Sequence, residues 1–251
     1  MDVKVSAFIR VKEEINTIEA CLNSIEGVFD RIVIIHSNEK DDGTINFIRN
    51  RQINYPNYEV YEYPYMVIPS HDTKYKTNFD DKNTLAAYNN FGLGFFENEE
   101  YVIKIDADQV YINQFLKEAV TRLKTENEEN IKYALKGYNT FIWNNTLVTY
   151  APTPINGYEG DSFFIKRKYM DKFIHNGQYE SLLLKDIKQT RIWYKPLWFH
   201  FMKTIKNNGN IRENNMLSES EIEFLTEQEK TLFNTNIRPL LNNSSYYNIG
   251  L

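Results

Sequence analysis

Two aspartates stand one residue apart at the end of an apolar run, in the stretch IKIDADQV from Ile103 to Val110. Side chains at positions i and i+2 of an extended chain point to the same side, so Asp106 and Asp108 project together from a strand end. Two carboxylates in this arrangement suit Mg²⁺ or Mn²⁺, which prefer oxygen ligands. The alternative is an ordinary solvated strand end, because a bare D-x-D pattern is a weak signal.

A short basic loop follows the first predicted strand, in AFIRVKEE from Ala7 to Glu14. Arg10 and Lys12 can pair with phosphates, and Glu13 or Glu14 can accept hydrogen bonds from hydroxyls. The alternative is a polar loop with acids at a helix N-terminus. The chain has no G-x-G-x-x-G motif and no P-loop, so neither Rossmann dinucleotide binding nor Walker-type ATP binding is supported.

A second polar loop follows the next predicted strand, in IIHSNEKDDGT. Asp42 and the two residues after it are typical of a turn that caps a helix. Ser37 and Asn38 lie just beyond the strand, where polar groups are placed to read the edge of a base.

Strands alternate with helices in the first hundred residues. We expect strands at 3–9, 31–35, 58–63 and 101–105, and helices at 15–25, from 45 onward and at 85–96. This alternation predicts a mostly parallel α/β sheet with helices on both faces. Ligands of such sheets bind beyond the carboxyl ends of the strands, which is where Asp106 and Asp108 would lie.

After Asp108 the pattern changes. One more helix is expected at 115–123, followed by aromatic-rich extended stretches at 132–143, 146–151, 160–167 and 191–202. These stretches predict a mixed or antiparallel extension of the sheet. The pattern SESE favours a final helix that begins at Ser218, because it supplies a cap and acids in the first turn.

Composition narrows the class of protein. A chain of 251 residues with a net charge of −5 suits one large α/β domain and has no basic field for nucleic acid. The single cysteine, Cys21, lies in an apolar helical pattern, which favours a core residue over a nucleophile and suits a reducing compartment. No signal-like apolar segment and no run of ~18 apolar residues occur, so we expect a cytoplasmic protein.

The motifs AFIRVKEE, IIHSNEKDDGT, YNNFGLGFF and YVIKIDAD occur in this order and together resemble an inverting GT-A glycosyltransferase of the family-2 type. AFIRVK with the later YPY and IKIDAD is most similar to bacterial β-1,4-N-acetylgalactosaminyltransferases of lipooligosaccharide synthesis. The resemblance covers residues 3–125 well and the remainder poorly. It implies a single GT-A domain with a nucleotide-sugar-binding half at 1–110, an acceptor-binding half at 111–217, and a C-terminal helix and tail at 218–251.

The resemblance implies a UDP-sugar donor. Asn38 stands where many members have a base-reading aspartate, and this departure leaves the nucleobase open. Asn90 and Gly92 match the A-x-N-x-G helix of the family. The donor nucleotide is assigned to Ala7, Ile9, Arg10, Glu14, Asn38, Lys82, Asn83, Asp106, Lys203 and Lys206.

The resemblance also implies Mn²⁺ or Mg²⁺, held by Asp106, Asp108 and a histidine from a later segment. His200 in KPLWFHFMK is the candidate, although a lone histidine among aromatic residues is otherwise a core residue. Inverting transfer further needs a carboxylate base. Asp161 in INGYEGDSFFI is the first candidate and Glu159 the second, and a simple turn residue is the alternative for Asp161.

These expectations describe a metal-dependent inverting enzyme that moves N-acetylgalactosamine or a related hexose to a bacterial surface glycan. The acceptor would be a lipooligosaccharide, a lipopolysaccharide or a capsule, and peripheral contact with the inner membrane would be weak at this net charge. Two alternatives stay open. A nucleotidyltransferase acting on sugar phosphates shares the layout and the metal, and a non-catalytic sugar-binding module shares the aromatic residues.

Overall fold

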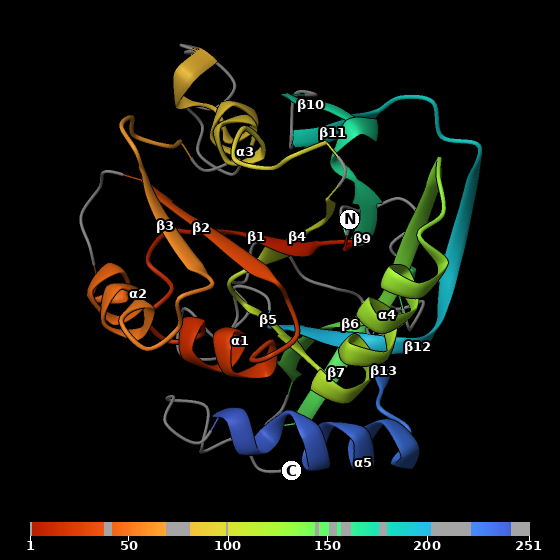
Figure 1. The fold of residues 1–251 in the computed structure, drawn as a ribbon. Coiled ribbons are helices and arrows are strands. Elements are labelled where there is room, and N and C mark those ends of the chain that lie inside the picture. Colours follow the sequence, from red (N-terminus) through yellow and green to blue (C-terminus); the bar gives the residue numbers. More distant parts are fainter. Residues whose placement is uncertain are drawn as a thin grey trace.

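The computed structural model describes residues 2–37, 42–68, 81–98, 100–143, 146–150, 155–156, 162–175, 180–201 and 222–241. A curled sheet lies at the centre with helices packed around it (Figure 1). Its strands are β1 (Val5–Val11), β2 (Arg31–Ser37), β3 (Tyr58–Tyr63), β4 (Tyr101–Asp106), β5 (Gln109–Tyr111), β6 (Ile131–Trp143), β7 (Thr146–Tyr150), β8 (Ile155–Asn156), β9 (Phe163–Lys166), β12 (Gln189–Phe201) and β13 (Ile222–Phe224). The helices are α1 (Ile18–Ser24), α2 (Thr44–Gln52), α3 (Leu85–Leu93), α4 (Asn113–Glu126) and α5 (Glu227–Asn236). The hairpin of β10 (Met170–His175) and β11 (Glu180–Leu184) forms a separate small sheet.

One half of the sheet is parallel, in the order β4-β1-β2-β3. Strands β1, β2 and β4 read as apolar runs because they are buried on both faces, whereas the edge strand β3 alternates as YEVYEY. The register of β1 against β4 makes Arg10 and Asp106 direct partners at the carboxyl ends of the two strands. The predicted parallel α/β sheet is therefore confirmed, and the register fixes where its polar residues meet.

The other half of the sheet is mixed, as predicted. Strand β9 runs antiparallel between β4 and β6, and β7 continues antiparallel to β6. The long strand β12 runs parallel to β6 and antiparallel to β5, which follows directly after the two aspartates. The pairing of His200 with Gln109 brings this late segment beside the end of β4.

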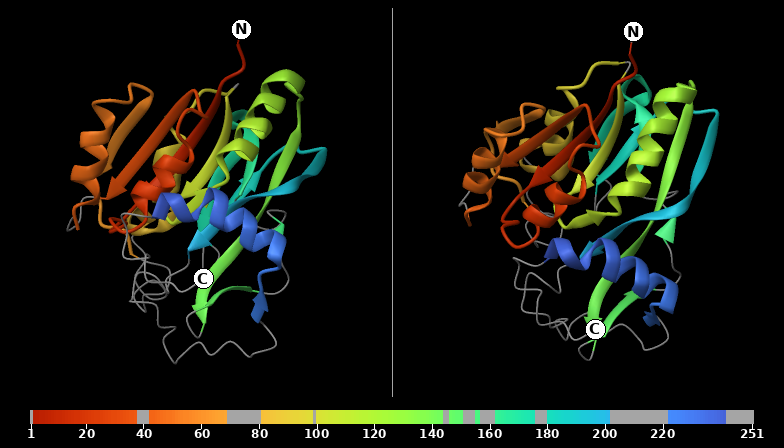
Figure 2. Two further views of the ribbon diagram at one scale, coloured as in Figure 1. Left: turned by 90° about the horizontal axis from the view of Figure 1, so that it is seen from below. Right: turned by 60° about the horizontal axis from the view of Figure 1, so that its bottom comes forward.

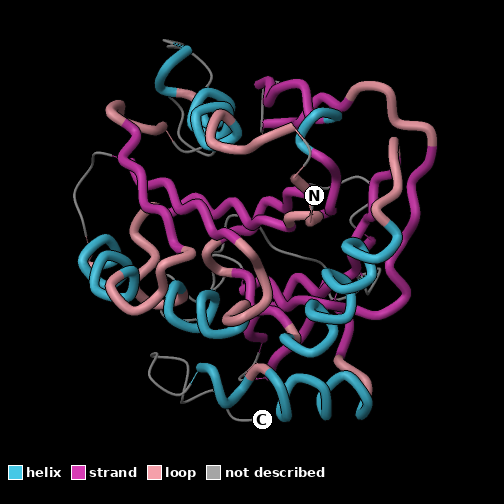
Figure 3. The backbone as a smooth tube through the Cα atoms, in the orientation of Figure 1, coloured by secondary structure: helices cyan, strands magenta, loops and turns pink. Residues whose placement is uncertain are grey.

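Two apolar cores cover the two faces of the parallel half. Helices α1, α2 and α4 pack on one face, and α3 with the β10–β11 hairpin packs on the other (Figures 1 and 3). Because side chains alternate along a strand, Ala7 and Ile9 enter the first core while Phe8 between them enters the second. Cys21 is buried in the first core, as its helical pattern predicted.

The C-terminal elements depart from the predicted helix that begins at Ser218. That residue lies outside the described part of the chain, but β13 is extended and pairs with β7. Helix α5 begins only after Thr226, whose hydroxyl accepts from the backbone N–H of Glu229 while the Glu229 carboxylate accepts in return. Residues 222–224 are therefore extended where the predicted helix would run, because the complete capping box of Thr226 and Glu229 starts the helix later.

Helix α5 packs against β12 and β5 through a third apolar cluster that contains Phe233, Phe199 and Val110. Figure 2 shows α5 running along this part of the sheet. Helix α1 also begins later than expected, at Ile18, and leaves Ile15 38% exposed in the preceding turn. Across the described ranges, no helix has the length and hydropathy needed to span a bilayer.

Gly92 is required where α3 packs on β1. A Cβ at this position would overlap the ring of Phe8, which is fully buried. We expect Gly92→Ala to lower the free energy of unfolding by about 1–3 kcal/mol, measured by urea denaturation. In a Phe8→Leu background the same substitution should cost less, because the clashing ring is gone. A parental denaturation midpoint for Gly92→Ala would contradict this packing.

Candidate active site

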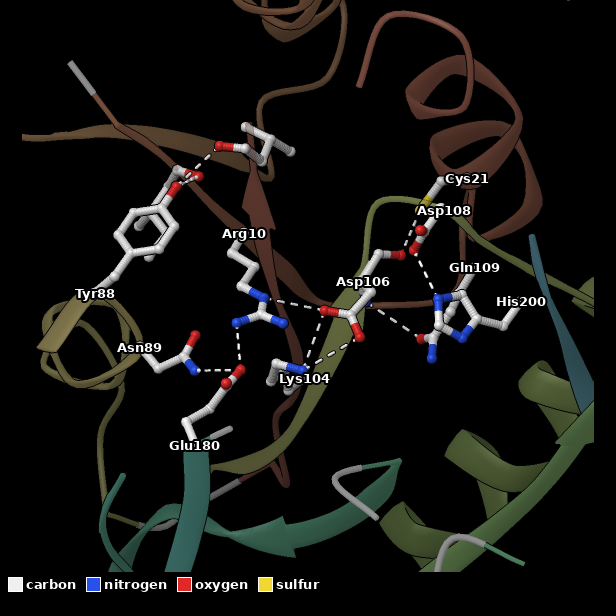
Figure 4. A network of polar contacts seen from close by, with 12 residues as sticks. Arg10, Cys21, Tyr88, Asn89, Lys104, Asp106, Asp108, Gln109, Glu180 and His200 are labelled. Carbon is white, nitrogen blue, oxygen red and sulfur yellow. Dashed lines mark hydrogen bonds and ion pairs between the residues drawn. The ribbon is translucent and has the colours of Figure 1, made fainter. Parts of the chain in front are cut away.

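A network of charged side chains lies where β1 and β4 end (Figure 4). Arg10 Nε lies 3.1 Å from Asp106 Oδ1, and Lys104 Nζ lies 3.1 Å from the same oxygen and 3.3 Å from Oδ2. Burial alone would raise the pKa of Asp106, but Lys104 and Arg10 outweigh it and hold the pKa below its ordinary value. Asp106 is therefore an ionised carboxylate that faces two cations.

The turn after β4 is fixed by a buried amide. Gln109 Oε1 accepts from the backbone N–H of Asp106 at 3.2 Å and from the Tyr111 hydroxyl at 3.0 Å. The side chains of Gln109 and Tyr111 are both buried. This support holds the backbone between Asp106 and Asp108, and no motif in the sequence marked Gln109 for it.

Asp108 faces His200, which arrives on β12. The Nε2 atom of His200 lies 3.1 Å from Asp108 Oδ1, and its Nδ1 atom lies 3.0 Å from Asn139 Oδ1. The backbone of Asp108 also accepts from Phe201 N–H at 2.9 Å. Burial is the largest single effect and lowers the pKa of His200, but the carboxylates of Asp108 and Asp106 together outweigh it, so the pKa of His200 is raised above its ordinary value. The structure thus brings two of the predicted metal ligands into direct contact.

The fit to a divalent cation rests on this pair. Asn139 Oδ1 accepts from Nδ1–H of His200, which points Nε2 toward Asp108, an arrangement typical of metal-binding histidines. The carboxylate of Asp106, by contrast, already faces Arg10 and Lys104. Within the described ranges, no cluster of three or more His, Cys, Asp or Glu side chains has the geometry of a metal site. Asp108 and His200 therefore fit two coordination positions, and a ligand would supply others.

Glu180 enters the network from the far side, and nothing in the sequence predicted it. This first residue of β11 forms an ion pair with Arg10 Nη1 and accepts from Asn89 Nδ2 at 3.4 Å. The pKa of Glu180 is lowered, because Arg10 and Lys104 outweigh the effect of burial. Beside it, the Tyr88 hydroxyl lies within hydrogen-bond distance of two carbonyls, at the ends of β1 and β2.

Lys104 was also missed, although the sequence carried a signal. It stands between isoleucines in a strand predicted to be buried, and a lysine there requires a charged partner. Its side chain is 5% exposed and points to the same side as Asp106, as the i, i+2 spacing dictates.

The other predicted donor residues lie in several settings. Ala7 and Ile9 are fully buried, so they would support a nucleoside pocket by packing rather than by direct contact with the ligand. Their role in donor binding stays a prediction. Glu14 accepts from the Thr17 hydroxyl at 3.1 Å, and its backbone N–H donates to Thr44 Oγ1 at 2.9 Å.

Lys82 and Asn83 lie in the short 3₁₀ helix before α3. Their carbonyls accept from the Tyr63 hydroxyl and from Ile68 N–H, and Lys82 Nζ lies 5.2 Å from the ring centroid of Tyr65. Asn38, Glu159, Asp161, Lys203 and Lys206 fall outside the described residues.

Three further groups of residues have structural roles. Asp42 caps the turn before α2 by accepting from Thr44 N–H at 3.0 Å, which confirms its structural reading. Asn90, from the predicted A-x-N-x-G helix, holds β10 through hydrogen bonds to the Phe173 backbone. The rings of Tyr138, Trp193 and Trp198 are buried in the cores rather than open to a sugar.

A family model described as beta-1,4-N-acetylgalactosaminyltransferase (CgtA) matches residues 2–246. No curated protein sequence matches the chain.

Solved structures of S. aureus TarS have a similar fold. TarS 1–349 superposes with a TM-score of 0.50 at 12% identity, over 79% of this chain and 60% of that chain. TarS 1–349 in complex with UDP gives a TM-score of 0.50 at 13% identity, over 78% and 60% of the two chains. The chain therefore spans about 60% of the length of these neighbours, and at this identity the likeness shows the fold. The family match covers almost the whole chain, and with the shared fold it confirms the predicted GT-A glycosyltransferase: the protein belongs to the beta-1,4-N-acetylgalactosaminyltransferase (CgtA) family.

Proposed function

We propose that the protein is a metal-dependent inverting glycosyltransferase that moves N-acetylgalactosamine or a related hexose from a UDP-sugar to a glycan hydroxyl. The observation that carries the proposal is the paired arrangement at the end of β4, where Arg10 and Lys104 face Asp106 while His200 faces Asp108. Family membership supports the reaction class, and the TarS 1–349 structure was solved with UDP.

The charge balance of the network supports a divalent cation. Among the described side chains of this network, Arg10 and Lys104 stand against three carboxylates, those of Asp106, Asp108 and Glu180. The diphosphate of a sugar nucleotide adds further negative charge to this partly buried region. Charges of one sign in such a site need compensation, and Mn²⁺ or Mg²⁺ commonly supplies it for diphosphates.

Asp108 Oδ1 and His200 Nε2 are the atoms proposed to hold the ion. A bound Mn²⁺ or Mg²⁺ would act as a Lewis acid that stabilises the negative charge of the leaving UDP. Asp106, kept ionised by its two cations, is proposed to accept hydrogen bonds from the ribose. Lys203 and Lys206 are proposed to neutralise the diphosphate as well.

The acceptor hydroxyl needs a base, and Asp161 is proposed for this role with Glu159 as the second candidate. In one displacement the acceptor oxygen bonds to the anomeric carbon, the bond to the diphosphate oxygen breaks, and the hydroxyl proton passes to the carboxylate. The register of β9 supports this choice. Lys166 pairs with Tyr101 and Ile165 with Val102, so the start of β9 runs toward the end of β4 that bears Asp106.

The acceptor is proposed to be a bacterial surface glycan, such as a lipooligosaccharide, a lipopolysaccharide or a capsule. A cytoplasmic location with weak peripheral contact with the inner membrane is proposed as well. Both points rest on the family to which the chain belongs.

A panel of UDP-sugars tests the proposed function. We expect slow, Mn²⁺-stimulated release of UDP from one member of the panel, with UDP-N-acetylgalactosamine as the first candidate, measured by chromatography. A nucleotidyltransferase would instead release diphosphate from UTP and a sugar 1-phosphate, and a binding module would release neither product. Release of UDP at the same rate after chelation of divalent ions would remove the metal from the proposal.

A further inference from the structure

The ion pair between Glu180 and Arg10 joins the β10–β11 hairpin to the proposed donor site (Figure 4). Exposure divides the network into two layers. The side chains of Arg10 and Asp106 are 21% and 20% exposed, whereas those of Glu180 and Lys104 are 8% and 5% exposed. Arg10 and Asp106 are thus open to a ligand, whereas Glu180 and Lys104 are buried and contact them from the protein side.

The hairpin does not depend on Glu180 for its position. The side chain of Asn90 accepts from Phe173 N–H at 2.7 Å and donates to the Phe173 carbonyl at 2.8 Å. Apolar residues of both hairpin strands pack in the second core, among them Met170, Phe173 and Leu182. Burying a carboxylate costs desolvation energy, and an apolar side chain of similar size at position 180 would pack the hairpin without needing a partner charge.

The effect of Glu180 falls instead on Arg10. A guanidinium is planar and donates from a rigid fork, so carboxylates on two of its nitrogens fix its orientation. Here Nε points to Asp106 on β4 and Nη1 points to Glu180 on β11. Without the Glu180 carboxylate, the Nη1 arm loses this acceptor, which favours a turn of the fork toward two hydrogen bonds with Asp106.

We propose that Glu180 is a positioning residue for donor binding and transfer, acting through Arg10. It draws one arm of the guanidinium away from Asp106, so that the Asp106 carboxylate stays available to the donor and Arg10 keeps one orientation beside the diphosphate. This inference rests on the proposed UDP-sugar site. The β10–β11 hairpin, through Glu180, would then help to orient Arg10 on β1.

The test is a double-mutant cycle in which kcat and KM for the UDP-sugar are measured on the full chain. Glu180→Gln is expected to lower kcat/KM by between about 10-fold and 100-fold, the effect of a displaced group in an active site. Because Glu180 acts through Arg10, the double variant Arg10→Gln/Glu180→Gln should be no worse than Arg10→Gln alone. Multiplicative losses in the double variant would overturn the proposal, since they would mean that Glu180 acts independently of Arg10.

Asn90→Ala is the matched control, because it removes the hydrogen bonds between α3 and the Phe173 backbone and leaves the charges intact. It should lower the midpoint of urea denaturation, and its effect on kcat/KM should multiply with that of Arg10→Gln. If Glu180→Gln fails to fold, Glu180→Asp replaces it in the same cycle, since it keeps the charge but withdraws it by one methylene. Turnover of the UDP-sugar by the parent tests the proposed function separately, so a parental rate for Glu180→Gln would defeat this inference alone.

Discussion

Asp108→Ala is expected to abolish the Mn²⁺ enhancement of UDP binding and to lower sugar transfer by at least ~10²-fold. Asp108 offers the carboxylate oxygen that faces His200 Nε2 at 3.1 Å, and His200 alone would leave the proposed ion with a single protein ligand. The negative charge that develops on the leaving UDP would then lose its main compensation. Isothermal titration of UDP with and without Mn²⁺ measures the binding effect, and UDP release measures the transfer.

Asp171→Ala is the control for this prediction, because Asp171 is an exposed carboxylate on β10. It should leave both the Mn²⁺ enhancement and the rate at parental values. Equal Mn²⁺ enhancement in the parent and in Asp108→Ala would mean that the metal, if bound at all, is held elsewhere. Thermal denaturation of each variant without metal separates a lost ligand from a lost fold.

The strands of the parallel half were predictable to within two residues at each end. Strand β3 has the bounds expected for it, Tyr58–Tyr63, and β4 ends at Asp106, one residue beyond its predicted end. Buried parallel strands such as β4 are continuous apolar runs, and the edge strand β3 alternates, so local sequence alone marks both kinds of strand. The position of Asp106 and Asp108 at a carboxyl edge followed from the same pattern.

The supports of the site were not predictable, because they depend on pairing between distant strands. Glu180 lies 170 residues from Arg10, and its neighbours along the chain form no recognised motif. Only the fold of the hairpin onto α3 brings it to the network. His200 was found through the family resemblance, and the reason for its position is the antiparallel pairing of β12 with β5. Lys104 is the exception, since a lysine inside a buried strand already indicated a buried partner.

Asp161→Asn is expected to lower sugar transfer by ~10²-fold or more while UDP binding stays within about threefold of the parent. The amide keeps the size of the side chain but accepts a proton far less readily than a carboxylate, so only the deprotonation of the acceptor should suffer. Strand β9 supports the choice, because Ser162 at its start accepts from Leu135 N–H at 2.9 Å and the strand begins toward the Asp106 end of β4. Steady-state kinetics with a hydroxyl acceptor and calorimetry with UDP give the two numbers.

Glu159→Gln is the matched control, since it makes the same chemical change two residues earlier in the chain. A loss of transfer in Asp161→Asn with a parental rate in Glu159→Gln supports Asp161 as the base, and the reverse result moves the role to Glu159. Parental rates in both variants would place the base on another residue and would leave Asp161 as the turn residue that its Gly-Asp context also allows.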